Sequence, residues 1–68
     1  MGFRKGDEVR WSTSQGETHG SVVERRTKDF QLDGQEFRAS EEEPYYVVES
    51  AKTGAKAAHK ESALRKRS

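Results

Sequence analysis

A chain of 68 residues with 37% charged and 29% hydrophobic side chains makes one small domain of marginal stability and leaves no room for a deep active-site cavity. It has no cysteine, which excludes disulfides and thiolate metal sites, and no long apolar run of the kind that crosses a membrane. The net charge of +1 hides an asymmetry, because residues 1–50 carry a charge of −4 and residues 51–68 a charge of +5. Residues 1–10 lack a signal-peptide pattern, so we expect a cytoplasmic protein without a membrane partner.

The first half of the chain predicts two strands joined by a loop. Charged and apolar residues alternate in residues 8–11, so Val9 and Trp11 should share the buried face of a strand. Residues 12–20, STSQGETHG, hold no periodic apolar signal, and we expect a long polar loop of the kind that often binds ligands. Residues 21–32 should form a second, bent strand. The glycine just before it indicates a sharp bend or a close approach of two backbones.

The middle of the chain predicts a hairpin and the central strand. Asp33-Gly34 lies between two strand-like runs and is a strong signal for a type I′ hairpin, because both central residues of that turn need a positive φ. The second arm should span residues 35–39. Pro44 closes a turn at residues 40–44, since proline cannot donate a ladder hydrogen bond. Residues 45–50, YYVVES, join two aromatic and two β-branched residues and predict the central strand.

The last third predicts a short strand and a basic end. A turn at Thr53-Gly54 should lead into a strand at residues 55–59, followed by a helical turn at residues 61–64 that covers the end of the core. We expect residues 65–68 to be a disordered basic tail after a single domain of residues 1–64. The five strands predict an all-β fold, a small bent barrel that hides its edges by closing on itself. Its predicted core is Val9, Trp11, Val22, Phe37, Val47, Ala57 and Leu64.

The chain contains four short motifs: Gly6-Asp7-x-Val9, Gly16-x-x-x-Gly20-x-Val22, Pro44-x-Tyr46 and Ser50-x-x-Thr53-Gly54. Together with the longer runs SQGETHG and KTGAKAAHK, they resemble the hypervirulence-associated Tudor-like domain family, which occurs in short bacterial proteins and in some fungal ones. The likeness extends over nearly the whole chain. It implies a small five-stranded SH3-like barrel of the Tudor type with a short C-terminal helical turn, and it implies no particular activity.

Tudor barrels in general bind methylated lysine or arginine in a cage of aromatic rings, because ring faces attract a desolvated cation. The resemblance therefore makes Trp11, Phe30, Tyr45 and Tyr46 candidate cage residues. The residue pattern assigns part of this set to the core, because Trp11 alternates with Val9 and one of the two adjacent tyrosines must face inward. We do not expect the three or four exposed rings of a complete cage.

The residue types that carry chemistry lack partners in this chain. His19 and His59 are the two histidines, whereas a metal site needs three or four converging ligands. The hydroxyl residues have no base at triad-like spacing. The Gly16-x-x-x-Gly20 spacing is not followed by the Gly-Lys-Ser/Thr of a phosphate loop. We therefore expect no enzymatic activity, no metal and no cofactor.

Protein interaction is the function that the near-neutral charge favours. The polar loop at residues 12–20 and the neighbouring aromatics would hold a peptide, or an exposed strand edge would accept one. A second copy of the chain is another candidate partner, because a marginal domain gains stability by oligomerising. Residues 51–54 would then act as the hinge of a strand-exchanged homodimer. The candidate ligand-binding residues are Trp11, Thr18, His19, Phe30, Tyr45, Tyr46, Lys52, Lys56 and Lys60.

The alternative is a nucleic-acid-binding barrel. In that case Trp11 or Tyr45 would stack on a base while basic residues contact phosphates. The charge of −4 on residues 1–50 argues against it. The phosphate contacts would come from Arg25, Arg26, Lys52, Lys56, Lys60, Arg65, Lys66 and Arg67.

Overall fold

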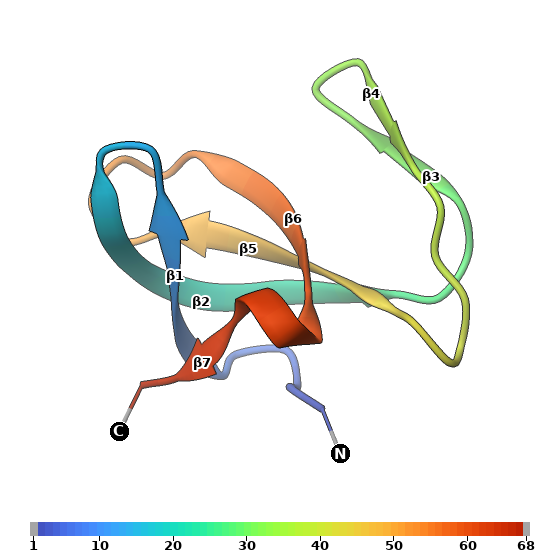
Figure 1. The fold of residues 1–68 in the computed structure, drawn as a ribbon, viewed down its shortest axis with the longest axis horizontal. Coiled ribbons are helices and arrows are strands. Elements are labelled where there is room, and N and C mark those ends of the chain that lie inside the picture. The colour runs from blue at the N-terminus through green and yellow to red at the C-terminus, as the bar shows by residue number, and fades with distance from the viewer. Residues whose placement is uncertain (1, 68) are drawn as a thin grey trace.

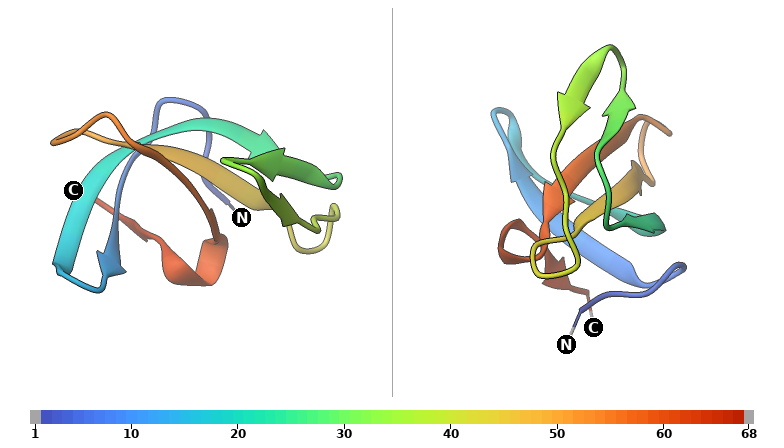
Figure 2. Two further views of the ribbon diagram at one scale, coloured as in Figure 1. Left: turned by 90° about the horizontal axis from the view of Figure 1, so that it is seen from above. Right: turned by 90° about the vertical axis from the view of Figure 1, so that its right-hand side faces the viewer.

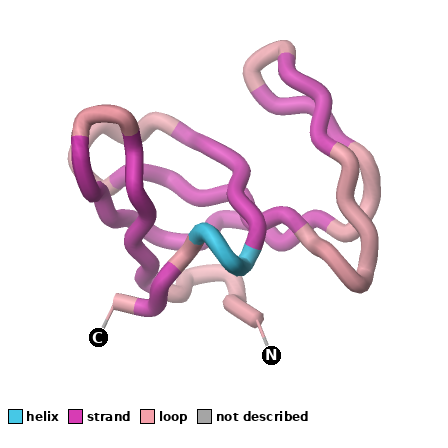
Figure 3. Tube along the Cα trace, viewed as in Figure 1, coloured by secondary structure: helices cyan, strands magenta, loops and turns pink. Residues whose placement is uncertain are grey.

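The computed structural model describes residues 2–67 as an all-β chain with one short 3-10 turn, η1 (Figures 1 and 3). Met1 and Ser68, at the outer ends of the predicted domain and tail, lie outside the described residues. The strands are β1 (Glu8–Thr13), β2 (Gly16–Arg26), β3 (Phe30–Leu32), β4 (Gln35–Phe37), β5 (Tyr45–Ser50), β6 (Lys56–Lys60) and β7 (Arg65–Lys66), and η1 (Glu61–Ala63) connects β6 to β7.

Five strands form one antiparallel sheet in the order β6-β5-β2-β1-β7. The sheet is strongly curved (Figure 2), and β2, with a β-bulge between Val22 and Glu24, is long enough to pair with β1 and β5. The predicted closed barrel is not confirmed, because β6 and β7 are sheet edges with no ladder between them among residues 2–67. Side chains span the open side instead, where the Trp11 ring of β1 lies 5.7 Å from the His59 ring of β6.

Gly20 lies where the backbones of β2 and β5 approach each other closely. It is buried within β2, opposite Val9 of β1 and Ser50 of β5. A Cβ atom at this position would overlap the main-chain carbonyl oxygen of Glu49. The close approach of two backbones predicted at Gly20 is therefore confirmed, and it requires a residue without a side chain.

The predicted loop at residues 12–20 is wrong, because most of this segment is a tight hairpin between β1 and β2. The ladder runs without a break from Glu8 opposite Ser21 to Thr13 opposite Gly16. At the turn, the Thr13 hydroxyl donates to the Gly16 carbonyl at 2.7 Å and accepts from the Gln15 N–H at 3.2 Å. Backbone hydrogen bonds hold these arms together. Because one side of the hairpin faces solvent, its sequence is polar and shows no apolar period.

The Asp33-Gly34 hairpin is confirmed. Asp33 has φ 53° and Gly34 has φ 76°, the positive values that a type I′ turn requires. The two arms β3 and β4 form a sheet of their own that projects away from the main sheet (Figure 1). The prediction of one strand over residues 21–32 is wrong, because β2 ends at Arg26 and the chain leaves the main sheet before β3.

The core lies on the concave side of the curved sheet. Phe37 and Ala57, predicted as core residues, are only half-buried. Tyr46 and Val48 of β5 belong to the core instead, because alternate residues of this strand face inward. Val47, between them, is also buried but lies outside the main cluster. The buried cluster consists of Val9, Trp11, Val22, Tyr46, Val48 and Leu64.

The C-terminal segment continues the sheet. Leu64 follows η1 and is 5% exposed, which confirms that this turn covers the end of the core. The next residues pair with β1 as β7, and the Arg67 N–H donates to the Glu8 carbonyl at 2.9 Å. The prediction of a disordered tail is therefore wrong for residues 65–67, because the buried Leu64 places the following backbone beside the free edge of β1.

In residues 2–67 no helix is long and apolar enough to cross a membrane.

Replacing Gly20 with alanine should lower the free energy of unfolding by about 2 kcal/mol, because the new methyl group must push β5 away from β2. Urea denaturation of the parent chain and the variant measures this difference. Ser12→Ala, on the exposed side of β1, is the control and should change stability by less than about 0.5 kcal/mol. A Gly20→Ala variant as stable as the parent would contradict the close approach of β2 to the Glu49 carbonyl.

Candidate binding site

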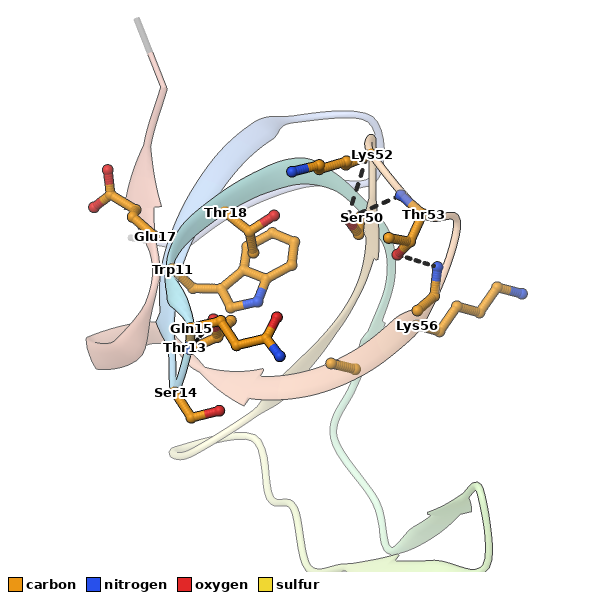
Figure 4. A pocket seen from close by; sticks show the side chains of 12 residues that line it. Trp11, Thr13, Ser14, Gln15, Glu17, Thr18, Ser50, Lys52, Thr53 and Lys56 are labelled. Carbon is orange, nitrogen blue, oxygen red and sulfur yellow. Dashed lines mark hydrogen bonds between the residues drawn. The ribbon is translucent and has the colours of Figure 1, made fainter.

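A cavity of about 440 Å³ opens where the β1–β2 turn faces the β5–β6 turn (Figure 4). Its lining comes from these two hairpins alone. Its volume lies within the range of clefts that hold small ligands or single side chains, about 300 to 1,000 Å³. We call this cavity the Trp11 pocket, after the aromatic residue at its base.

Trp11 lies at the base of the pocket. Its side chain is 4% exposed and lies across the inside of the curved sheet, with Thr18 on one side and Gln15 on the other (Figure 4). Thr18 is the register partner of Trp11 across the β1–β2 ladder, so both side chains point inward. The indole N–H and the side-chain amide of Gln15 bring hydrogen-bond donors to this side of the pocket.

The opposite wall is a turn held together by side-chain hydroxyls. Ser50 Oγ accepts from the N–H groups of Lys52 at 3.3 Å and Thr53 at 3.4 Å, and Thr53 Oγ1 accepts from the Ala55 N–H at 3.2 Å. Gly54, with φ 76°, closes the turn by donating to the Ser50 carbonyl at 2.8 Å. The predicted turn at Thr53-Gly54 is thus confirmed, and its hydroxyls line the pocket.

The charge at the mouth is positive. Lys52 extends across the rim of the pocket toward the β1–β2 hairpin, whereas Lys56 and Glu17 point away from the pocket (Figure 4). Glu17 forms an ion pair with Arg10 at 3.8 Å across the outer face of the β1–β2 hairpin. Among the labelled side chains, Lys52 is therefore the one whose charged end lies at the mouth of the pocket.

Four of the nine predicted ligand-binding residues, Trp11, Thr18, Lys52 and Lys56, lie together in the pocket lining. His19 is exposed and lies opposite Arg10 in the ladder, outside the pocket. Tyr46 lies in the core, 1% exposed, where its hydroxyl accepts from the Phe3 N–H at 3.3 Å. A tyrosine buried in this way is not available as a ring of a binding cage.

Sequence reasoning missed Gln15, Ser50 and Thr53 as lining residues. The available signal was the density of hydroxyl and amide side chains in the two turns, since such side chains commonly bond to turn backbones. The sequence did not show that the two turns face each other, which depends on the curvature of β2.

The remaining candidate aromatics form a separate cluster where the β3–β4 hairpin meets β5. Ring centroids are 5.2 Å apart for Phe30 and Phe37, 5.9 Å for Phe30 and Tyr45, and 5.2 Å for Phe37 and Tyr45. The rings thus contact one another and leave no room for a cation between them. This cluster fastens the hairpin to the main sheet.

The chain's own cations lie against this cluster. Arg26 Cζ is 5.1 Å from the centre of the Phe30 ring, and Lys60 Nζ is 5.6 Å from that of Tyr45. Lys60 also donates to Glu43 at 2.9 Å, and this hydrogen bond raises the pKa of Lys60. Trp11 and Tyr46 are therefore buried in the core cluster, whereas Phe30 and Tyr45 belong to the hairpin cluster, and no aromatic cage forms from the four candidates.

The basic residues proposed for phosphate contacts are partly neutralised. Arg26 pairs with Glu24 at 3.1 Å, Lys60 with Glu43 at 2.9 Å and Arg67 with Glu8 at 3.7 Å.

In the part of the chain that the structure describes, no three potential metal ligands of the His, Cys, Asp or Glu type converge. The Trp11 pocket therefore combines an apolar base with polar walls and a lysine at its rim.

His59 should make stability depend on pH, because burial lowers its pKa from the ordinary value of 6.5. A lowered pKa in the folded state means that the unfolded chain binds a proton more readily. The stabilisation is therefore complete well above pH 6.5 and is lost as the pH falls through the lowered pKa of the folded chain. Urea denaturation at a series of pH values should show this loss in the parent and in His19→Gln, which changes an exposed histidine. A His59→Gln variant with the same pH slope as the parent would contradict this account.

Comparison with known proteins was made at three levels. Residues 6–64 match the sequence profile of the family described as the Tudor domain of hypervirulence-associated proteins. No match was found among the curated proteins or among the solved structures. The profile covers most of the described strands, from the turn before β1 through Leu64. The chain therefore belongs to the hypervirulence-associated Tudor domain family.

Proposed function

We propose that this chain is a non-enzymatic binding module that holds a segment of a partner protein in the Trp11 pocket. The proposal is based on the pocket, which combines an apolar base with hydrogen-bonding walls from two opposed turns. Peptide side chains offer both apolar and polar surface, so they match such a lining. Membership of a Tudor family supports a binding role at this coarse level.

Ion pairing of the basic residues and packing of the aromatic residues favour a protein partner over nucleic acid. Three of the eight proposed phosphate-binding residues form ion pairs within the chain. Trp11 is 4% exposed and Tyr45 packs against two other rings, so neither presents an open ring face to a base. Nucleic-acid binding without stacking would depend on nonspecific phosphate attraction.

Titration of isotope-labelled protein with a pool of random hexapeptides should shift the amide signals of Thr18, Ser50 and Lys52 and the indole N–H signal of Trp11. A parallel titration with single- and double-stranded oligonucleotides should move only basic surface residues, and that effect should fade at higher salt. Oligonucleotide shifts at the Trp11 indole that persist at higher salt would contradict the proposal.

A matched pair of variants tests the location. Thr18→Arg fills the pocket and should abolish the peptide-induced shifts, whereas His19→Arg adds the same charge on the outer face of the same strand and should leave them intact. The dispersion of the amide spectrum shows whether each variant is folded. A folded Thr18→Arg variant that still responds to the peptides would place the binding site elsewhere.

Self-association through β6 is a second candidate. It is favoured by the position of β6 at an edge of the main sheet, since an unpaired edge accepts another strand. We expect the sedimentation coefficient to rise with protein concentration as two copies pair or exchange this strand. A strictly monomeric species at high concentration would exclude this role and leave the peptide-binding proposal unaffected.

A further inference from the structure

We infer that the Trp11 pocket selects a carboxylate, carried by an Asp or Glu side chain of the partner segment. The inference rests on the proposed function, because it names the group that the same pocket would take. It comes from the hydrogen bonds that the hydroxyl groups of the two turns already make and from the charge at the mouth.

The Ser50 hydroxyl is available only as a donor. A hydroxyl oxygen has two lone pairs, and Ser50 Oγ already accepts from two backbone N–H groups, those of Lys52 and Thr53. Its O–H hydrogen is then the group left to bond a ligand. A ligand atom beside Ser50 must therefore be an acceptor.

Other polar groups of the lining favour an acceptor as well. Thr53 Oγ1 accepts from the Ala55 N–H, which leaves its hydrogen to donate. Thr13 Oγ1 both donates and accepts within its own turn, so it offers less to a ligand. The indole N–H of Trp11 can only donate.

The charge at the mouth has the same preference. Lys52 extends across the rim of the pocket, while Glu17 points away and pairs with Arg10 (Figure 4). A methylated lysine entering the pocket would meet the ammonium group of Lys52 and a single aromatic ring. A carboxylate would meet a cation and several donors, and such charge-assisted hydrogen bonds are about twice as strong as neutral ones.

The probes are three hexapeptides of identical sequence, acetylated and amidated at their ends, whose central residue is Glu, Gln or trimethyl-lysine. Trp11 is the single tryptophan of the chain, so its fluorescence reports on the pocket, and amide shifts confirm the location. The Glu peptide should bind about tenfold more tightly than the Gln peptide, the factor that about 1.4 kcal/mol of charge-assisted bonding produces. Acetate alone should bind far more weakly than the Glu peptide.

Two variants assign the selectivity. Lys52→Gln should remove most of the tenfold preference for Glu over Gln. Lys28→Gln, on the connection between β2 and β3 and outside the pocket lining, should keep it.

The possible outcomes distinguish a failure of carboxylate selectivity from a failure of peptide binding. If the pocket responds to peptides but binds Glu and Gln equally, or prefers trimethyl-lysine, the carboxylate inference is overturned and peptide binding stands. If acetate binds as tightly as the Glu peptide, the pocket is a small-anion site and the peptide source is overturned. If neither the three probes nor the random pool shifts the pocket signals, both proposals fail.

Discussion

The close approach of β2 to β5 at Gly20 determines the shape of the sheet. The missing side chain lets β2 lie against the Glu49 carbonyl, and β2 can therefore bend and pair with β1 on one side and β5 on the other. This curvature turns the ends of the β1–β2 and β5–β6 hairpins toward each other. The burial of Trp11 and the existence of a pocket above it both follow from that geometry.

The chemistry of the pocket is a consequence of how its turns are stabilised. In a short turn the backbone N–H groups need acceptors, and serine and threonine hydroxyls supply them. At Ser50 and Thr53 the oxygens accept from turn N–H groups, which leaves the hydroxyl hydrogens to donate to a ligand. The same residues that hold the β5–β6 turn thus give the pocket its donor character. The ammonium of Lys52 adds the positive charge.

Local rules predicted the parts of the structure that local interactions determine. The Asp33-Gly34 turn, the glycine at the close crossing and the strand after Pro44 could be recognised from residue type and spacing. The predictions failed for β7, where pairing with the distant strand β1 decides the outcome, and for the hairpin of β1 and β2, whose polar arms show no apolar period. The site divides in the same way: Trp11, Thr18, Lys52 and Lys56 were predicted, but the separation of the other aromatics into a core tyrosine and a hairpin cluster depends on tertiary packing.

A crystal structure of the chain with the Glu-containing hexapeptide would show where the carboxylate binds. We expect the glutamate carboxylate inside the Trp11 pocket, with its oxygens within hydrogen-bond distance of Lys52 Nζ and Ser50 Oγ, about 2.7 to 3.2 Å. A peptide bound along the outer edge of β6, or a glutamate bound to basic residues outside the pocket, would contradict it.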